Sequence, residues 1–151
     1  MNGEVFVDEL LKIVEDLNMN SIVLNRNGIF NSVTPYSYMI SKIKEQVPFT
    51  REEIKQQAEN IFNAVKVLPL LVKTVNYKSL CKSMVGSYGL KHVVEEILKT
   101  NYISNGDVIL AMLYLKYEVG YPKENPINCY FNCKYVDSDR NIHYKEHTLK
   151  F

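Results

Sequence analysis

The sequence has no tryptophan, and it has only three cysteines and three arginines among 151 residues. The cysteines are Cys81, Cys129 and Cys133, an odd set without the spacing of a disulfide framework, which indicates reduced thiols inside a cell. Lysine outnumbers arginine fifteen to three. Because arginine makes the commonest specific contact to a base, this scarcity disfavours a protein that reads DNA sequence.

A long apolar run and a targeting signal are also missing. No stretch of about 18 uncharged apolar residues occurs, so we expect no membrane span and no membrane partner. The amino terminus, Met1–Glu4, lacks the basic segment of a secretory signal, and Asp8 interrupts the apolar residues after it. The sequence therefore predicts a cytoplasmic protein.

Motifs of known catalytic chemistry are absent as well. The sequence contains no Gly-x-Ser-x-Gly, His-Glu-x-x-His or Walker motif. A nucleophile and its base could be assembled from Cys81 or Ser87 with His92. However, His92 lies opposite the apolar stripe of its predicted helix, beside Glu95, Glu96 and Lys99. We expect that face to be solvated, with His92 and Glu96 as a pair four residues apart. We therefore favour a protein that is not an enzyme and has no cofactor.

Acidic residues are absent from one internal block that runs from Asn60 to Val94. This block carries the lysines Lys66, Lys73, Lys78, Lys82 and Lys91. Residues 1–62 sum to a charge of −3, residues 63–93 to +5 and residues 94–151 to −1, although the net charge is only +1. Such asymmetry steers anionic partners, but lysines on the wet faces of ordinary helices would give the same count. Both interpretations stay open.

The hydrophobic pattern predicts an α+β fold, a mainly helical single domain over residues 1–151 with a C-terminal β-hairpin and a short N-terminal hairpin. The helical body covers about 1–120, and the C-terminal hairpin covers about 127–150, with a turn at 138–141. Within the body, the apolar spacing predicts helices at about 4–17, 34–47, 50–68, 70–75, 79–84, 90–98 and 108–117, and a hairpin of 21–24 with 29–33.

Two helix starts carry clear capping signals. Thr50 and Glu53 fit a capping box, and the helix after them should stop or kink at Pro69. The segment 104–107, Ser-Asn-Gly-Asp, caps the helix after it. That helix is apolar on nearly all sides, which is typical of a central, buried helix.

The hexapeptide Ser-Tyr-Gly-Leu-Lys-His, residues 87–92, predicts a turn followed by a helix that begins at Leu90. Backbone amides at a helix start attract anions, and Gly89 would let a phosphate approach closely. Ser87, Lys91 and His92 would supply further donors. Ordinary turn chemistry before a helix explains the same residues, so this anion site is a hypothesis beside that simpler interpretation.

Four candidate metal ligands lie near the carboxyl end: Cys129, Cys133, His143 and His147. Their order resembles a Cys2His2 zinc site. However, two cysteines four residues apart on a strand are about 13 Å apart, which is too far for one tetrahedral ion. We therefore prefer core thiols on a hairpin and expect no metal, with a zinc-stabilised interaction module as a remaining alternative.

The order of two helices and a hairpin in the last third is similar to that of a winged helix. The second helix, about 108–117, has no basic residue before Lys116 and is too apolar to face DNA. If nucleic acid binds, the lysine block and Arg140 at the hairpin tip would contact phosphates without reading sequence.

Three segments resemble small uncharacterised proteins of bacteriophages and mobile elements: residues 87–92, residues 102–106 (Tyr-Ile-Ser-Asn-Gly) and residues 126–132 around Asn128, Tyr130 and Phe131. The resemblance covers about residues 86–133. It implies a viral or mobile-element setting, hence the host cell cytoplasm, and it directs attention to the Ser87–His92 segment and the Asn-Gly cap.

These observations together predict a non-enzymatic accessory protein of viral or mobile-element origin. We expect it to bind a host or defence macromolecule, a protein or nucleoprotein, through a basic surface; sequence-independent binding of nucleic acid is the alternative. The candidate partner- or anion-binding residues are Lys73, Lys78, Lys82, Ser87, Tyr88, Gly89, Lys91, His92, Asn105 and Arg140.

Overall fold

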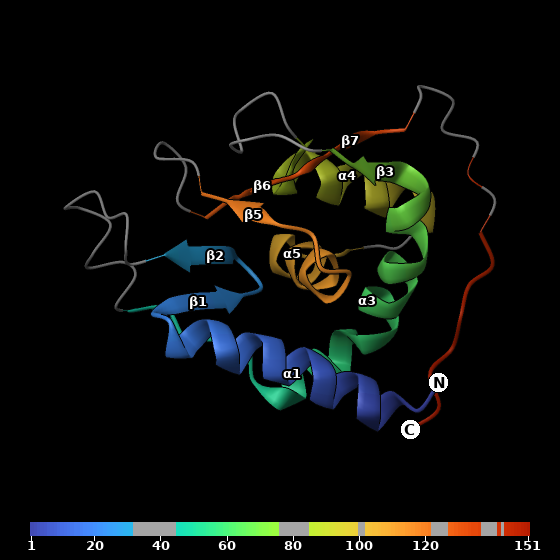
Figure 1. The fold of residues 1–151 in the computed structure, drawn as a ribbon. Helices are drawn as coiled ribbons and strands as arrows, with labels where there is room; N and C mark the ends of the chain where they lie inside the picture. Colours follow the sequence, from blue (N-terminus) through green and yellow to red (C-terminus); the bar gives the residue numbers. More distant parts are fainter. Residues whose placement is uncertain (32–44, 76–84, 100–101, 122–126, 137–141, 143) are drawn as a thin grey trace.

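A computed structural model describes residues 1–31, 45–75, 85–99, 102–121, 127–136, 142 and 144–151, and it has the predicted single-domain α+β fold (Figure 1). Its helices are α1 (Gly3–Met19), α3 (Arg51–Leu71), α4 (Ser87–Leu98) and α5 (Asn105–Tyr114). Its short strands are β1 (Ile22–Asn25), β2 (Gly28–Asn31), β3 (Val72–Thr74), β4 (Val85–Gly86), β5 (Val119–Gly120), β6 (Tyr130–Phe131) and β7 (Cys133–Tyr135). Residues 34–44 of the helix predicted at 34–47, and the whole helix predicted at 79–84, lie outside the described residues, and residues 46 and 47 are not helical.

Helix α5 lies at the centre of the fold, surrounded by α1, α3 and α4 (Figure 1). Its residues from Asn105 to Met112 are all buried, because apolar side chains cover nearly its whole circumference. The prediction of a central, buried helix is confirmed. Across the described ranges, no helix has both the length and the apolar character that crossing a membrane requires.

The predicted capping box of α3 is confirmed, and the cap predicted for α5 is also a capping box. In α3, the Thr50 hydroxyl accepts from the Glu53 N–H at 3.2 Å, and the Glu53 carboxylate accepts from the Thr50 N–H at 3.0 Å. In α5, Ser104 and Asp107 form the same pair of hydrogen bonds, each of 3.0 Å. Each box satisfies backbone donors that a helix start leaves open, so the local sequence alone sets these boundaries.

The sequence predicted that α3 stops or kinks at Pro69, and the helix does not stop there but continues to Leu71. The proline removes a backbone donor only in the last turn, where few helical bonds remain to be lost. The N–H of Val72 then donates to the carbonyl of Leu68 and closes the helix. The segment 70–75, predicted as helical, instead ends α3 and forms β3, because β3 pairs with the distant strand β7.

The C-terminal strands exist, but they do not form the predicted hairpin of residues 127–150. Strand β6 lies between β4 and β5, and β7 pairs antiparallel with β3. Phe131 and Cys133 are fully buried against the helices, and this burial draws both strands to partners in the helical body. The described residues 142 and 144–149 form no strand, and the predicted turn at 138–141 lies outside the described residues.

The N-terminal prediction is confirmed in both of its elements. Helix α1 begins after Asn2, whose side chain caps it by accepting from the N–H groups of Glu4 and Val5. Strands β1 and β2 then pair antiparallel across a turn at Arg26 and Asn27. This hairpin lies between α1 and the β4–β6–β5 sheet (Figure 1).

The hairpin turn packs against the start of α5 with no side chain between the two backbones. The Gly106 N–H donates to the carbonyl of Arg26 at 3.2 Å. A Cβ on Gly106 would overlap the carbonyl oxygen of Asn25. A Cβ on Gly28, whose φ is +148°, would overlap the carbonyl oxygen of Ile127. We call this meeting of residues 25–28, 105–106 and 127 the backbone joint.

The two ends of the chain lie side by side (Figure 1). Asn2 forms a parallel bridge with Lys150, and the Gly3 N–H donates to the carbonyl of Lys150 at 2.7 Å. The Phe151 ring lies against Gly3, with the Lys55 ammonium 5.5 Å from the ring centroid. The C-terminal segment is therefore fastened to the start of α1.

Candidate functional site

Helix α4 begins at Ser87, so the prediction of a turn before a helix start at Leu90 is wrong. Gly86 is the N-cap, with extended backbone and no side-chain cap. Residues 87–92 are therefore the first turns of the helix itself. The helix begins this early because of a pairing between distant segments. Strand β4 pairs with β6 and ends at Gly86, so the helix starts at the next residue.

Ser87 is buried and engaged, which removes it from the predicted anion site. Its hydroxyl accepts from the Cys129 N–H at 3.1 Å, and its own N–H donates to the Cys129 carbonyl at 2.8 Å. The hydroxyl and the N–H of Ser87, which were expected to bind a phosphate, therefore join α4 to Cys129. The predicted phosphate cradle does not form from these groups.

Lys91 lies between two exposed tyrosines. Its ammonium nitrogen is 5.8 Å from the ring centroid of Tyr88 and 5.0 Å from that of Tyr102. The same nitrogen is 3.2 Å from a Glu95 oxygen, and only 12% of the lysine side chain is exposed. His92 completes the cluster, since its ring packs edge-on against Tyr88 at 4.6 Å and its Nδ1 is 3.5 Å from Glu95. One oxygen of the Glu95 carboxylate therefore lies close to both side chains.

A third tyrosine, Tyr135 of β7, reaches the same place from a distant part of the chain. Its hydroxyl is 3.9 Å from the position that a Cβ on Gly89 would occupy. Tyr88, Tyr102 and Tyr135 are 54%, 48% and 44% exposed, although large rings usually pack into the interior. We call Tyr88, Lys91, His92, Tyr102 and Tyr135 the tyrosine surface.

Two lysines lie opposite each other on the β3–β7 pair, the strand pair that carries Tyr135. Lys73 of β3 lies directly opposite Lys134 of β7, and both are exposed. Like charges directly opposite in an antiparallel pair are destabilising. The neighbouring pair in the register is Val72 with Tyr135, and successive residues of a strand point to opposite faces, so the two lysines lie on the face of the β3–β7 pair opposite to Tyr135.

The acid-free block does not form one uniform basic patch in the described part of the chain. Lys66 lies on α3 over the Phe62 ring, at 5.0 Å from the centroid, whereas Lys73 is on β3 and Lys91 is paired on α4. Lys78, Lys82 and Arg140 lie outside the described residues. Among the described lysines of this block, only Lys91 belongs to the tyrosine surface.

Asn105 is a buried connector, so its predicted place on a partner-binding surface is wrong. Its Nδ2 lies 2.8 Å from Oδ1 of Asn128, 3.1 Å from the carbonyl oxygen of Ile127 and 3.2 Å from that of Asn27. These contacts hold the backbone joint together. The Asn-Gly pair after Ser104 therefore serves packing, because the amide bridges two loops and the glycine admits the hairpin turn.

The terminal cysteines are core thiols. Cys129 and Cys133 are fully buried, and burial raises both pKa values, that of Cys133 to about 12. Zinc binds the thiolate, which these sites disfavour at neutral pH. His147 donates its backbone N–H to Asn63, and its ring packs against Phe62; His143 lies outside the described residues. No group of three metal-binding side chains occurs within the described ranges.

We expect these two thiols to react with a disulfide reagent at least about a thousandfold more slowly in the native protein than in guanidinium, because reaction requires unfolding. The measurement uses a Cys81→Ser variant, since Cys81 lies outside the described residues. Absorbance of the released thiolate gives the rate. Fast labelling of either thiol in buffer would show that it is not in the core, and loss of stoichiometric zinc on labelling would favour the zinc-stabilised module.

The sequence directed attention to Tyr88, Lys91 and His92 but missed Tyr102, Tyr135 and Lys134. Tyr102 follows α4 and Tyr135 belongs to β7, so only tertiary structure brings them to residues 88–92. The one feature of the sequence that indicated contacts within this cluster was the four-residue spacing of Lys91 and Glu95, which predicts an ion pair across one helical turn. The chain matches no protein-family model, no curated protein and no solved structure.

Proposed function

We propose that this protein acts by binding, without catalysis, and that the tyrosine surface is its contact with a partner protein. The observation that carries this proposal is the Lys91 ammonium lying between the half-exposed rings of Tyr88 and Tyr102. Tyrosine gives a large, rigid contact area at a small cost in side-chain entropy, and it is enriched among residues that dominate binding energy.

The contacts around Lys91 organise the surface before a partner arrives. The ion pair with Glu95 and the two nearby rings restrict a side chain that is otherwise among the most flexible. The His92 ring packs edge-on against the Tyr88 ring and restrains it. A surface that is already ordered loses less entropy on binding, which favours affinity.

The charge pattern favours a partner with carboxylates at one edge. Lys73 and Lys134 repel each other across the β3–β7 pair, and an acidic side chain placed between them would relieve this repulsion. Such a pair at the rim of a contact chiefly affects the association rate and the choice of partner. We therefore propose an acidic group on the partner that reaches the face of the β3–β7 pair opposite to Tyr135.

The same pattern favours a protein over nucleic acid. Affinity for nucleic acid rises with the number of phosphates that free cations neutralise. On the tyrosine surface, Lys91 and His92 share the carboxylate of Glu95, which reduces their value as phosphate ligands. The resemblance to bacteriophage and mobile-element proteins supports a host or defence protein, or its nucleoprotein complex, as the partner.

The test is a capture experiment from the natural host, with nuclease and without it. We expect a specific protein to be retained in both conditions, and a Tyr88→Ala/Tyr102→Ala variant to lose about tenfold to thirtyfold in affinity per ring. The matched control is Met19→Ala, which removes another exposed apolar side chain at the far end of α1. The circular dichroism and Tm of all variants should match those of the parent protein.

Two outcomes would overturn this proposal. Retention of the same partner by the tyrosine variant would show that the contact lies elsewhere. Loss of every partner after nuclease, with affinity falling steeply as salt rises, would instead support sequence-independent binding of nucleic acid. In that case Lys73→Glu and Lys134→Glu should weaken binding more than the tyrosine changes.

A further inference from the structure

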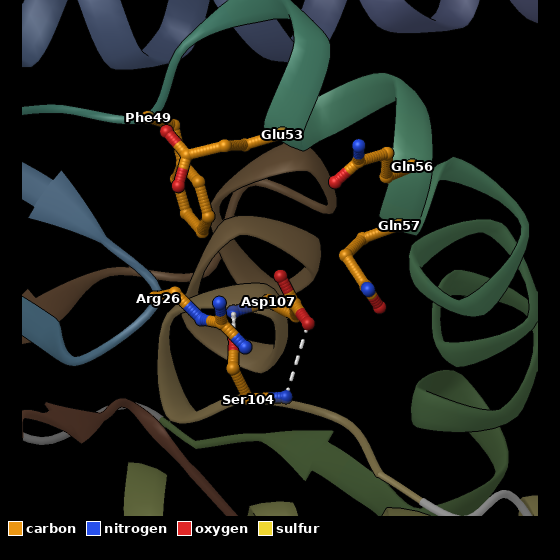
Figure 2. Close-up of a pocket in the computed structure, with 7 residues that line it drawn as sticks. All are labelled: Arg26, Phe49, Glu53, Gln56, Gln57, Ser104 and Asp107. Atoms are coloured by element: carbon orange, nitrogen blue, oxygen red, sulfur yellow. Dashed lines mark hydrogen bonds between the residues drawn. The ribbon is translucent and has the colours of Figure 1, made fainter.

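A second polar site lies between the starts of α3 and α5 and shares no residue with the tyrosine surface. It is a cavity of about 30 Å³, large enough for a group the size of a water molecule. Figure 2 shows the side chains around it, from α3 and the segment before it, the turn of the β1–β2 hairpin, and the start of α5. The lining residues are Arg26, Phe49, Glu53, Gln56, Gln57, Ser104 and Asp107.

Asp107 brings a buried carboxylate with one unused oxygen to this cavity. The residue is 1% exposed, and its Oδ2 accepts from the Ser104 N–H at 3.0 Å. Its Oδ1 is fully buried and has no hydrogen-bond partner among the described residues. In Figure 2 this oxygen points away from Ser104, toward the side chains of α3. A buried acceptor without a donor is costly, so the site favours an occupant that donates a hydrogen bond.

A second carboxylate faces the same cavity, because Glu53 is the capping residue of α3 just as Asp107 is that of α5. Its Oε1 accepts from the Thr50 N–H, which leaves the other oxygen for an occupant. Gln56 and Gln57 add amide groups, although the Gln57 oxygen already accepts from Asn60 at 3.2 Å.

The charges around the cavity do not balance. Asp107 and Glu53 are acidic and Arg26 is the one basic residue among the described lining residues, so the site carries one excess negative charge when both carboxylates are ionised. Burial raises the pKa of Asp107, and Glu53 raises it further, whereas the Ser104 hydrogen bonds and Arg26 lower it. A single positive charge in the cavity would neutralise the set and stabilise the ionised form of Asp107.

We propose that this cavity binds a primary ammonium group, carried by a small amine or by a lysine side chain. The group has three N–H donors, one for Asp107 Oδ1 and the others for the free oxygen of Glu53 and an amide oxygen. Its head is the size of a water molecule and carries one charge, as the cavity volume and the lining charges require. A guanidinium is too large for this volume, and a divalent ion would leave an excess positive charge beside Arg26.

The test is the thermal unfolding of the full chain, followed by calorimetric titration, with methylammonium chloride at constant ionic strength. A ligand of two heavy atoms binds no tighter than about 6 mM. At 100 mM we expect a saturable rise in Tm of at most about 3–6 °C, the value that this ceiling in affinity gives. Tetramethylammonium, which has no N–H donor and a larger head, should give none of this rise.

Variants assign the effect to the cavity. Glu53→Gln preserves the capping box, because glutamine also caps, and should weaken methylammonium binding at least about fivefold. Asp107→Asn should abolish it; if that variant does not fold, Glu53→Gln carries the test alone. The matched control is Glu52→Gln, which removes an exposed carboxylate from the same first turn of α3 and should bind like the parent.

A blocked lysine, Nα-acetyl-lysine methylamide, distinguishes the two sources of the ammonium group. Tighter binding than methylammonium would assign the site to a lysine side chain, and equal or weaker binding would assign it to a small amine. No saturable rise with either ligand would overturn the proposal. An equal rise with tetramethylammonium, or unchanged binding by Glu53→Gln, would overturn it as well.

Discussion

Replacing Gly106 by alanine is expected to lower the free energy of unfolding by about 4 kcal/mol. The new Cβ would overlap the Asn25 carbonyl oxygen and lie 2.6 Å from its carbon and 2.9 Å from the Arg26 Cα. All three are backbone atoms, so no side-chain rotation relieves the overlap. The hairpin turn would have to leave the start of α5.

Gly89→Ala is the matched control for this change. Gly89 is also a helical glycine near a helix start, but a Cβ there meets only the Tyr135 hydroxyl at 3.9 Å, an ordinary contact. Because alanine is the better helix former, we expect a change between zero and about 1 kcal/mol of added stability. Urea denaturation of both variants measures the difference. Equal stabilities would show that the backbone joint is not as close as described.

The second large effect is expected for Asn105→Asp, which keeps the shape of the side chain and removes its donors. The three acceptors now near Nδ2, on Asn27, Ile127 and Asn128, would face a buried carboxylate. We expect a loss of about 3–4 kcal/mol at pH 7, because charge repulsion and desolvation act together. The control is Asn18→Asp, an exposed amide on α1, with an expected change below about 0.5 kcal/mol.

The pH dependence of the Asn105→Asp variant follows from the same cause. Burial and the surrounding oxygens favour the protonated acid, so the pKa of the introduced carboxyl group is higher in the folded variant than in the unfolded chain. The folded state then binds more protons than the unfolded state, and the variant gains stability relative to the parent as pH falls through the folded pKa. Denaturation midpoints of variant and parent between about pH 4 and pH 8 measure this gain. A constant difference across that range would contradict the assigned contacts.

The features that sequence predicted correctly are those that depend on neighbouring residues. The capping boxes of Thr50 with Glu53 and of Ser104 with Asp107 form between residues three apart, and the turn between β1 and β2 has an Asn-Gly pair. The apolar circumference of α5 likewise requires burial wherever the helix lies. Nothing distant is needed to form these features.

The errors share one cause, which is pairing between segments far apart in the chain. Segment 70–75 has helical spacing, yet Val72–Thr74 forms a strand because β7 lies beside it. Residues 142 and 144–149 were expected to pair with the strand before them because no other partner was visible in the sequence. The helical body instead supplies a partner for β6 and another for β7. Local patterns carry no information on which of two edges a strand will choose.

The candidate sites divide in the same way. Residues 88–92 could be singled out because charge and glycine mark them locally, but the burial of Ser87 depends on Cys129 and the third ring comes from β7. The cavity beside Asp107 was not predictable, although both of its carboxylates were identified as caps. Their meeting depends on how α3 packs against α5, which the sequence pattern does not specify.

The contact between Asn2 and Lys150 makes the chain a nearly closed ring. A short linker can therefore join residue 151 to residue 1 while every described contact stays in place. Another peptide bond can then be opened to make the new ends. Circular permutation exploits this property, and the new ends belong in an exposed loop away from the backbone joint. The order in which the helices leave the ribosome can thus be altered while the folded topology stays the same.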